Sequence, residues 1–491
     1  MNDISTNIKK VMFVFLLCFL GVVSYLTYFE IFKAPTIVLM PENQRLWIKR
    51  NEVLRGTIFD RNGIPLVAST RVNSETQTRE YYYGPMFAQV LGYESPSYGL
   101  TGLEEEYDSY LSSDNSTLNL NNISISSVIS MLKGESADKI GDNLTTTLNY
   151  NLQKLAFNLL VDPSTGDELK GAVVALNPKT GEILAMVSRP SYDPNNLQSL
   201  MDSIKNAPKN SDLIINSPLM NRATSGLYPP GSTFKTVTAI AALENIDGVM
   251  NKRINDTGKL VFNDKQSLSN DDGEVMGNIG FEQAFAQSSN VYFGQLGLDL
   301  GNAKLKSVAE KLFFNKNVPA DGITIQNSQF PSYNSYEDGD IAQSAIGQSG
   351  VLASPMEMAL ITSAIANNGV SMMPYLVKEV TDSKGNVVNK FVPKSNGTVM
   401  SQSTAQTMKD FMLDVVKEGT GTSAAINGVE VCGKTGTAQH GVSQLSDSWF
   451  IGFAPYDNPQ IAVAVIVENG GYGAGIAASI ASQVMKSALN Q

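Results

Sequence analysis

An uncharged apolar run near the N-terminus is the clearest hydrophobic feature of the chain. It covers residues 11–29 and lies between the basic pair Lys9-Lys10 and Glu30. A helix of about twenty apolar residues is long enough to cross a bilayer. The run is long for a cleaved signal peptide and no clean small-x-small site follows it, so it predicts an uncleaved anchor. The two lysines predict that residues 1–10 are cytoplasmic and that the rest of this single-pass chain is extracellular.

Beyond the anchor, the hydrophobic pattern changes in two steps. Residues 30–144 begin as a mixed polar stalk and continue, from Arg55, as short apolar alternations between clusters of Gly, Ser and Asn. Alternation of this kind predicts a small pedestal domain built from short strands. From Thr145 the periodic segments become longer, which predicts a second and larger domain over residues 145–491.

Within residues 145–491, strand signals lie at both ends and helix signals lie between them. A long, mostly helical insertion separates the first two predicted strands from the last three, and a terminal helix is predicted over residues 474–489. This order predicts an α+β fold in which a five-stranded antiparallel sheet lies between helices. The predicted strands are residues 171–177, 182–188, 429–437, 448–454 and 460–468.

Composition and charge exclude several classes of protein. The 491 residues are too many for one ordinary domain, and a hydrophobic share of 42% provides for a large core. A net charge of −11 offers no positive surface for nucleic acid, so nucleic-acid partners are excluded. Two cysteines, Cys18 and Cys432, are too few for a disulfide framework.

A serine and a lysine three residues apart supply the first candidate chemistry. Ser232 and Lys235 follow Pro229-Pro230-Gly231, which ends any earlier element and places Ser232 in the first turn of a helix. Residues i and i+3 share a helix face, so the hydroxyl and the amine can approach each other. A lysine that burial keeps neutral can deprotonate a serine, and the N–H groups of a first turn favour a developing negative charge. The pattern therefore predicts an acyl-transfer site.

Two later motifs distinguish this pair from chance Ser-x-x-Lys sequences. Ser288 and Asn290 follow a helical pattern and offer a hydroxyl and an amide. Lys434-Thr435-Gly436-Thr437 lies among apolar residues that predict a strand. An earlier Lys179-Thr180-Gly181 lies between two strand-like runs, and there the pattern predicts only a β-hairpin turn with glycine at positive φ.

The ordered set Ser232-x-x-Lys235, Ser288-x-Asn290 and Lys434-Thr435-Gly436 resembles the motifs of the penicilloyl serine transferases, and the chain as a whole resembles a class B penicillin-binding protein. The resemblance runs from about residue 43 to the C-terminus and is weakest over residues 108–143. It implies a β-lactamase/transpeptidase-like catalytic domain and a non-catalytic pedestal. Segments outside the motifs that support it include residues 55–63, 102–104, 221–223 and 449–455.

The resemblance also implies a reaction, the D,D-transpeptidation of peptidoglycan. Ser232 would attack the penultimate D-Ala carbonyl of a stem peptide, with Lys235 as general base. An amine of a neighbouring stem would then take the acyl group and form a cross-link, and water would compete as a carboxypeptidase side reaction. β-Lactam antibiotics would acylate Ser232 and remain there. No cofactor is implied.

Other residues of the three motifs would position the substrate and move protons. The resemblance makes Ser288 a relay to the leaving D-Ala, and it assigns Asn290 to holding both the donor amide and Lys235. Lys434 would orient the substrate and polarise Ser288. An edge strand can bind a peptide by main-chain pairing. The implied substrate-binding residues are Thr435, Gly436 and Thr437, and the implied oxyanion hole is the backbone N–H groups of Ser232 and Thr437.

Three residues near the motifs have two interpretations each. Tyr228 either lines the donor cleft or packs in the core. Cys432 and His440 are of the right types for zinc, but their spacing matches no zinc pattern, and the alternative is a buried cysteine and a loop histidine. A Ser-His-Asp hydrolase would have to use His440, the only histidine, yet no Gly-x-Ser-x-Gly turn precedes a serine.

Two other functions are compatible with the same motifs. A β-lactamase or β-lactam sensor would share them but would have no use for a pedestal, and a catalytically weak scaffold would only hold a polymerase in place. The pedestal is too short to be a glycosyltransferase domain. The resemblance implies instead that anchor and pedestal pair with a membrane-embedded glycosyltransferase of the division or elongation machinery, which acts on the lipid-linked precursor polymer.

Overall fold

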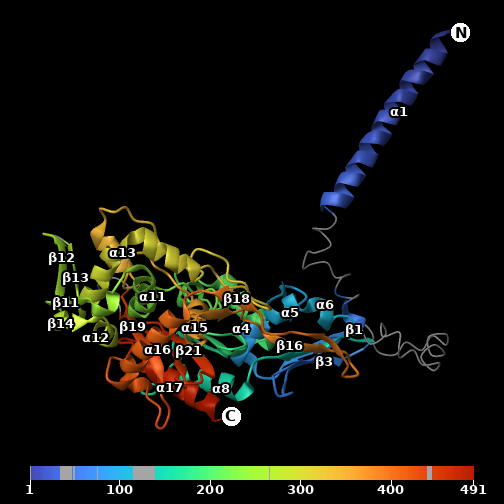
Figure 1. The fold of residues 1–491 in the computed structure, drawn as a ribbon. Coiled ribbons are helices and arrows are strands. Elements are labelled where there is room, and N and C mark those ends of the chain that lie inside the picture. The colour runs from blue at the N-terminus through green and yellow to red at the C-terminus, as the bar shows by residue number, and fades with distance from the viewer. Residues whose placement is uncertain are drawn as a thin grey trace.

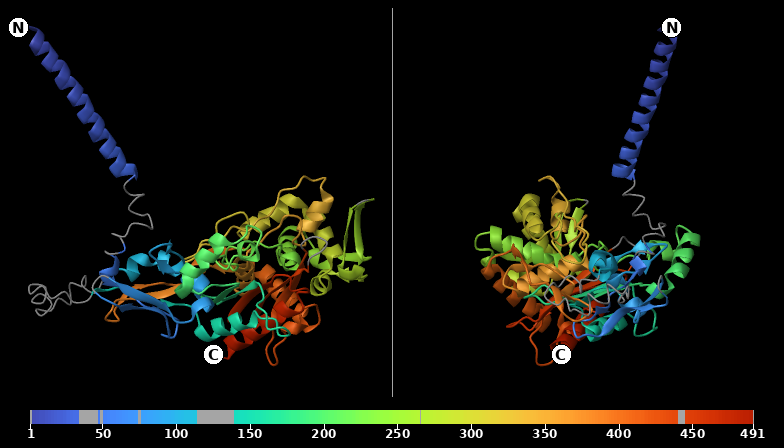
Figure 2. Two further views of the ribbon diagram at one scale, coloured as in Figure 1. Left: turned by 180° about the vertical axis from the view of Figure 1, so that it is seen from behind. Right: turned by 90° about the vertical axis from the view of Figure 1, so that its right-hand side faces the viewer.

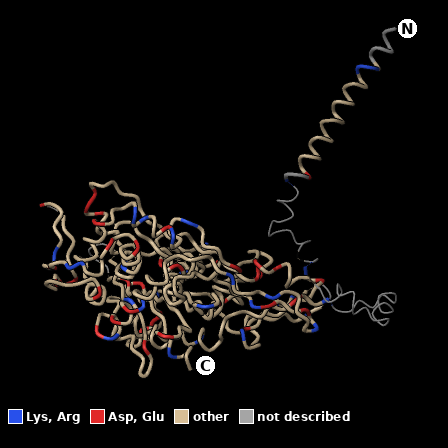
Figure 3. Tube along the Cα trace, viewed as in Figure 1, with Lys and Arg blue, Asp and Glu red and all other residues tan. Residues whose placement is uncertain are grey.

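The computed structural model describes residues 2–33, 47, 50–73, 76–113, 139–264, 266–439 and 445–490. Helix α1 (Asn2–Tyr28) extends away from the rest of the molecule and is followed by a π-turn at Phe29–Lys33 (Figure 1). Its segment Ile8–Tyr28 is long and apolar enough to cross a membrane, and no other part of the described chain covers it. Lys9 and Lys10 lie at the start of this segment and Glu30 lies just beyond its end, whereas elsewhere both signs are interspersed (Figure 3). The predicted anchor is therefore confirmed as an apolar helix.

A five-stranded sheet forms the centre of the larger domain. The strand order is β10-β9-β21-β20-β19, and every neighbouring pair is antiparallel. This confirms the five predicted strands and leaves β19 at an edge. The hairpin turn between β9 and β10 contains Lys179-Thr180-Gly181, with Gly181 at φ +81, as predicted. The strands are β9 (Gly171–Leu176), β10 (Ile183–Arg189), β19 (Cys432–Ala438), β20 (Asp447–Ala454) and β21 (Ile461–Val467).

Helices cover both faces of this sheet (Figure 2). Alternate side chains of β21 point to opposite faces. Val465 therefore belongs to the same hydrophobic cluster as residues of α8 (Tyr150–Leu159) and α17 (Ile476–Leu489), while Ala464 belongs to the cluster that includes α15 (Pro355–Ala366). Helix α15 is buried at all twelve positions, which explains why its sequence lacks a polar face. Its start is fixed by a proline in the first turn and by the Ser354 hydroxyl, which accepts from the N–H of Glu357.

The helical insertion carries two small two-stranded sheets at the end of the molecule farthest from α1 (Figure 1). Its helices include α11 (Lys235–Asn245), α12 (Phe281–Ala286) and α13 (Asn290–Lys311). Strand β11 (Arg253–Asp256) pairs with β14 (Gly277–Gly280), and β12 (Lys259–Asn263) pairs with β13 (Gln266–Ser269). Helix α16 (Gln402–Lys417) packs between this insertion and strand β19.

The pedestal is a six-stranded sheet of order β17-β16-β8-β2-β3-β4. Two of these strands come from the C-terminal half of the chain, which the sequence pattern did not predict. The division of the chain near residue 144 stays a prediction, because the pedestal sheet draws on residues from both sides of it. The strands are β2 (Ile58–Phe59), β3 (Pro65–Arg71), β4 (Gln77–Tyr81), β8 (Asn143–Thr146), β16 (Val377–Thr381) and β17 (Val387–Lys390).

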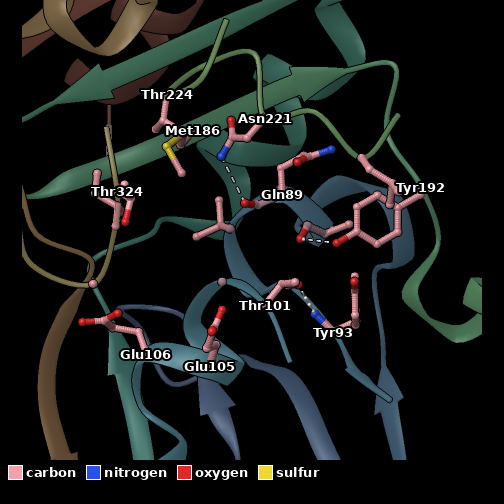
Figure 4. A pocket seen from close by; sticks show the side chains of 17 residues that line it. Gln89, Tyr93, Thr101, Glu105, Glu106, Met186, Tyr192, Asn221, Thr224 and Thr324 are labelled. Atoms are coloured by element: carbon pink, nitrogen blue, oxygen red, sulfur yellow. Dashed lines mark hydrogen bonds between the residues drawn. The ribbon is translucent and has the colours of Figure 1, made fainter. Parts of the chain in front are cut away.

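A cavity of about 290 Å³ lies where the pedestal meets the larger domain. Figure 4 shows Gln89 and Tyr93 on the pedestal side, opposite Asn221. The amide of Asn221 donates to the carbonyl of Gln89 at 3.2 Å, which ties the pedestal to the chain that leads to Ser232. None of the residues of the three sequence motifs lines this cavity, so it is separate from the candidate site.

Candidate functional site

The candidate nucleophile lies in a tight turn directly before a helix. Residues Gly231–Phe234 form a 3₁₀ turn and α11 starts at Lys235, which confirms the predicted placement of Ser232 at a helix start. Gly231 has φ +52, and its N–H donates to the carbonyl of Gly347 at 3.1 Å. Ser232 is partly exposed and lines a cleft of about 650 Å³.

Glycines on both sides allow this turn to contact the edge strand β19. A Cβ atom on Gly231 would stand 2.5 Å from the carbonyl oxygen of Thr437. A Cβ atom on Gly436 would stand 2.8 Å from Thr233 Cγ2 and 2.9 Å from the carbonyl oxygen of Pro230. Such distances leave no room for a side chain, so both positions require glycine. The backbone that approaches Gly436 in this structure is that of the nucleophile turn.

Lys235 directs its amine at the Ser-x-Asn motif. The Nζ atom lies 2.6 Å from the carbonyl oxygen of Ser288, 3.1 Å from its Oγ atom and 2.7 Å from Asn290 Oδ1. The Lys235 side chain is fully buried, with the ring of Phe293 5.7 Å from Nζ. Ser288 has φ +60 and lies between α12 and α13, so the second motif occupies a corner between two helices.

Lys434 contacts the same serine from the sheet side. Its Nζ atom donates to Ser288 Oγ at 2.9 Å and to the carbonyl oxygen of Thr435 at 3.1 Å. Lys434 is also fully buried, and Phe285 lies below its amine at 5.8 Å. The Ser288 hydroxyl therefore lies between two buried lysines.

Burial in this apolar corner changes the protonation of both lysines. Burial, followed by the charge of Lys434, lowers the pKa of Lys235 well below its usual value. Burial also lowers the pKa of Lys434 to about 7. In a neutral Lys235 amine, the two N–H groups are used by the carbonyl of Ser288 and by Asn290, which leaves the lone pair to accept a proton. Lys235 thus has the chemistry of a general base.

The third motif lies on the edge strand and borders the cleft. Thr437 lines the cleft and its Oγ1 atom accepts from the N–H of Gly473 at 3.2 Å. The hydroxyl of Thr435 shares a hydrogen bond with that of Thr420 at 2.6 Å. Other residues around the opening are Asp271, Asp272, Gln343, Gln348, Gln439, Leu445 and Tyr472.

Tyr228 packs in the core beside the nucleophile turn. It is 8% exposed, its hydroxyl donates to Glu468 Oε1 at 2.8 Å, and its ring meets Trp449 edge to face. The residues that line the cleft do not include Tyr228, and its contact with a bound donor stays a prediction. Cys432 is buried with its thiol against the carbonyl of Lys409, and burial raises the pKa of that thiol.

Of Cys432 and His440, the two residues considered as zinc ligands, only Cys432 is described, since His440 lies outside the described residues. Among the residues that the structure describes, no three His, Cys, Asp or Glu side chains are grouped to hold a metal ion.

Residues that support the second motif were missed by sequence reasoning. Asn290 Nδ2 donates to the carbonyl of Ser269 at 2.9 Å, and the backbone N–H of Asn290 donates to Asn270 Oδ1 at 2.8 Å. Both partners lie at the end of strand β13, about twenty positions earlier in the chain. No local pattern marks them, because only the fold of the insertion brings them to the start of α13.

Comparison with known proteins agrees with this geometry. Residues 171–486 match a family model described as the penicillin binding protein transpeptidase domain, and residues 55–137 match one described as the penicillin binding protein A dimerisation domain. The chain is 31% identical over 507 residues to the peptidoglycan D,D-transpeptidase PbpA of Mycolicibacterium smegmatis, and the match covers 99% of each chain.

Solved structures give the same result. The ceftriaxone acyl-enzyme of penicillin-binding protein A from M. tuberculosis matches with a TM-score of 0.80 and 30% identity, covering 90% of this chain and all of that one. The D,D-transpeptidase domain of a peptidoglycan glycosyltransferase from Eggerthella lenta matches with a TM-score of 0.76 and 33% identity, covering 89% and 99%. The chain therefore belongs to the penicillin-binding protein transpeptidase family, as a member of its class B.

Proposed function

We propose that this chain is a serine D,D-transpeptidase that cross-links peptidoglycan stem peptides through an acyl-enzyme on Ser232 and is inhibited by β-lactams. The observation that carries the proposal is the Ser288 hydroxyl, which lies 3.1 Å from Lys235 Nζ and 2.9 Å from Lys434 Nζ. The cleft beside these groups is lined by Ser232 and Asn290. These contacts support a site in which a nucleophile, a buried base and a proton relay act together beside an open cleft.

Acylation begins with transfer of the Ser232 proton to neutral Lys235. The Ser232 Oγ atom then bonds to the penultimate D-Ala carbonyl carbon of the donor stem. The backbone N–H groups of Ser232 and Thr437 hold the oxyanion, and one such donor contributes about 3–4 kcal/mol of transition-state stabilisation. Ser288 passes the proton on to the nitrogen of the leaving D-Ala as its C–N bond breaks.

The second step returns the enzyme to its starting state. An amine of a neighbouring stem attacks the acyl carbon and gives its proton to the neutral Lys235. As the Ser232 ester bond breaks, that proton passes from Lys235 to the Ser232 Oγ atom. Water in place of the amine gives a carboxypeptidase product. Asp271 and Asp272 line the same cleft and place negative charge where a protonated acceptor amine arrives.

The donor peptide is proposed to pair with β19, because that strand is the edge of the sheet. Thr435 and Thr437 offer hydroxyls to the terminal carboxylate, and Lys434 offers a positive charge. The Asn290 side chain binds both the donor amide and the Lys235 amine. A β-lactam would occupy the same position, with its ring carbonyl in the oxyanion hole.

The topology and the polymerase partner are also part of the proposal. Lys9 and Lys10 precede the apolar segment, which supports a cytoplasmic N-terminus and an extracellular catalytic domain. The pedestal holds none of the catalytic motifs, and four of its six strands (β2, β3, β4 and β8) lie on the chain between the anchor and the five-stranded sheet. A pedestal in that place can hold a membrane-embedded glycosyltransferase of the division or elongation machinery, whose glycan product is the substrate for cross-linking.

The test is acylation of the full chain in detergent by a fluorescent penicillin, followed by intact mass over hours. A stable adduct that Ser232→Ala lacks supports the transpeptidase. Rapid loss of the adduct with hydrolysis of the drug would favour a β-lactamase, and absence of an adduct on folded protein would favour a scaffold. Cross-linking of nascent glycan made by an added glycosyltransferase then tests the physiological reaction.

A further inference from the structure

We propose that Asp256 is a positioning residue that fixes the Ser288-x-Asn290 motif through the start of helix α13. The inference deepens the proposed function and rests on it. Asp256 is the last residue of β11, is fully buried, and lies 32 positions before Ser288 in the chain. Burying a carboxylate costs free energy unless hydrogen bonds compensate for the lost hydration. The groups that bond to Asp256 therefore indicate its role.

The first three N–H groups of α13 are all capped by two side chains. Asn270 Oδ1 accepts from the backbone N–H of Asn290 at 2.8 Å and from that of Val291 at 3.1 Å. The hydroxyl of Ser289 accepts from the N–H of Tyr292 at 2.9 Å. A helix has no internal partners for these groups, so the two caps determine where the first turn lies.

Asp256 holds both caps at once. Its Oδ1 and Oδ2 atoms accept from Asn270 Nδ2 at 2.9 and 2.8 Å, and Oδ2 also accepts from the Ser289 hydroxyl at 2.6 Å. The N–H of Gly258 donates to Oδ1 at 2.8 Å, which anchors the carboxylate to its own turn. Asn270 is 5% exposed and Ser289 is fully buried, so water cannot readily replace these bonds.

The first turn of α13, which these bonds hold in place, positions the proposed proton-transfer groups of the site. Asn290 accepts from Lys235 Nζ at 2.7 Å, and Ser288, with φ +60, directly precedes the cap residue Ser289. A shift of the first turn therefore moves three of the acceptors that orient Lys235. Misplacement of catalytic groups by about 1 Å can lower a rate about 100-fold.

Asp256 also acts on Lys235 by charge. The charged groups that face Lys235 are Lys434, which lowers its pKa, and Asp271 and Asp256, which raise it. Removing the Asp256 charge is thus expected to lower the pKa of Lys235. The fall of the acylation rate at acid pH, the acid limb of its pH profile, would then move to lower pH. The reason is that the Lys235 amine stays neutral down to a lower pH.

The experiment compares acylation of the full chain in detergent by a fluorescent penicillin, from pH 5 to 9, for Asp256→Asn and Asp256→Ala. We expect the acylation rate of Asp256→Ala to fall about 100-fold. Asp256→Asn keeps the shape and part of the bonding, so its loss is expected to be smaller while its acid limb moves to lower pH. Binding of penicillin before acylation is expected to change less than the acylation step.

Asp382 provides a matched control. It is 2% exposed and its carboxylate accepts from the N–H groups of Lys384 and Asn386 and from Asn386 Nδ2, but it lies in the turn after β16 in the pedestal. Asp382→Asn is expected to lower thermal stability and to keep the acylation rate and its pH profile. A merely structural role for Asp256 would give the same pattern as this control.

The outcomes separate the two proposals. If the wild-type chain forms no adduct, the proposed function fails. If the wild-type chain is acylated but Asp256→Asn and Asp256→Ala match it in rate and acid limb, the role of Asp256 fails. Should Asp256→Ala not fold, Asp256→Asn decides the question alone, because a wild-type rate with an unmoved acid limb would overturn the inference.

Discussion

The carbonyl oxygen of Thr437 lies 2.5 Å from the point that a Cβ atom on Gly231 would occupy. The nucleophile turn and the edge strand of the sheet are thus in direct backbone contact. Since Ser232 and Thr437 are the two proposed oxyanion donors, this contact sets their separation. The geometry of the proposed oxyanion hole therefore depends on the absence of a side chain at residue 231.

Gly231→Ala is therefore expected to damage catalysis more than stability. The new methyl group meets main-chain atoms that cannot rotate away, and the φ of +52 adds strain of about 1–3 kcal/mol. We expect the rate of penicillin acylation to fall at least about 100-fold, as loss of an oxyanion donor does. Stopped-flow acylation with a fluorescent penicillin measures it.

Gly428→Ala is the control for that experiment. Gly428 has φ +77, and no atom lies within 4 Å of the position that an added methyl group would take, so it tests strain without a clash. It is expected to lose about 1 kcal/mol of stability and to keep its acylation rate. Equal acylation rates for Gly231→Ala and wild type would refute the role given to the Gly231–Thr437 contact.

The lowered pKa of Lys434 makes the free energy of unfolding depend on pH. The folded chain releases the Lys434 proton at a pKa of about 7, while the unfolded chain keeps it up to the usual value of 10.5. Between these values the unfolded state binds more protons, so this lysine makes the fold more stable as pH rises from about 7 to 10.5. The slope for one proton is about 1.4 kcal/mol per pH unit.

Lys434→Met is expected to remove the contribution of Lys434 to the change in the free energy of unfolding with pH. The variant is also expected to be acylated slowly, because Ser288 loses its partner on the sheet side. Lys235 has a lowered pKa as well, so part of the slope remains in the variant. Denaturant unfolding at pH 7, 8 and 9 gives the slopes. A slope unchanged from wild type would mean that Lys434 is protonated in the fold throughout this range.

Glu357 is a buried carboxyl group with the opposite pH dependence. It is fully buried in α15, and neither of its oxygen atoms has a hydrogen-bond partner within the described part of the chain. Burial raises its pKa from 4.5 to about 8. The folded state binds the extra proton between these values, so this group makes the fold less stable as pH rises from 4.5 to 8.

Glu357→Gln is accordingly expected to stabilise the protein above neutral pH by about 1–3 kcal/mol and to change little near pH 4.5. The amide keeps the shape of the side chain and cannot ionise. Thermal melting at pH 5 and pH 8 tests this, with Glu310→Gln on α13 as a partly exposed control. A variant less stable than wild type at pH 8 would show that the carboxylate has a partner that matters.

Local sequence patterns were sufficient for the elements that depend on neighbours in the chain. Alternation and turn residues gave the five strands and the hairpin at Gly181, and the Pro-Pro-Gly stop gave the turn that holds Ser232. The convergence of the three motifs was expected from their resemblance to those of the penicilloyl serine transferases. Lys235 and Ser288 meet at 3.1 Å although 53 residues separate them.

The features that local patterns could not predict depend on tertiary packing. Strand β16 reads as an ordinary strand, and nothing within it indicates that its partner is β8, more than 200 positions earlier. Asp256 and Asn270 read as turn residues until the fold places them under α13. Tyr228 was equally compatible with cleft or core. No local pattern indicates that its hydroxyl donates to Glu468, a residue 240 positions later.

The pedestal contains a buried ion cluster whose members are far apart in the chain. Arg55 donates to Glu104 at 2.7 Å and to Asp108 at 2.5 Å, and Arg79 donates to Glu104 at 2.8 Å. Arg55 is 2% exposed and Glu104 is fully buried. Burial raises the pKa of Glu104, but Arg79 and Arg55 outweigh that effect and hold the pKa below its usual value.

Arg55→Met should therefore destabilise the pedestal by about 3–5 kcal/mol at pH 8, because it leaves a buried carboxylate with one arginine in place of two. The cost is expected to shrink at pH 5, since the pKa of Glu104 rises without Arg55 and the neutral acid tolerates burial. Arg50→Met, which removes a partly exposed partner of Asp108, should cost only about 0–1 kcal/mol. Denaturant unfolding of both variants at the two pH values measures these costs. Equal costs for the two variants would show that the cluster behaves as a surface ion pair and not as a buried one.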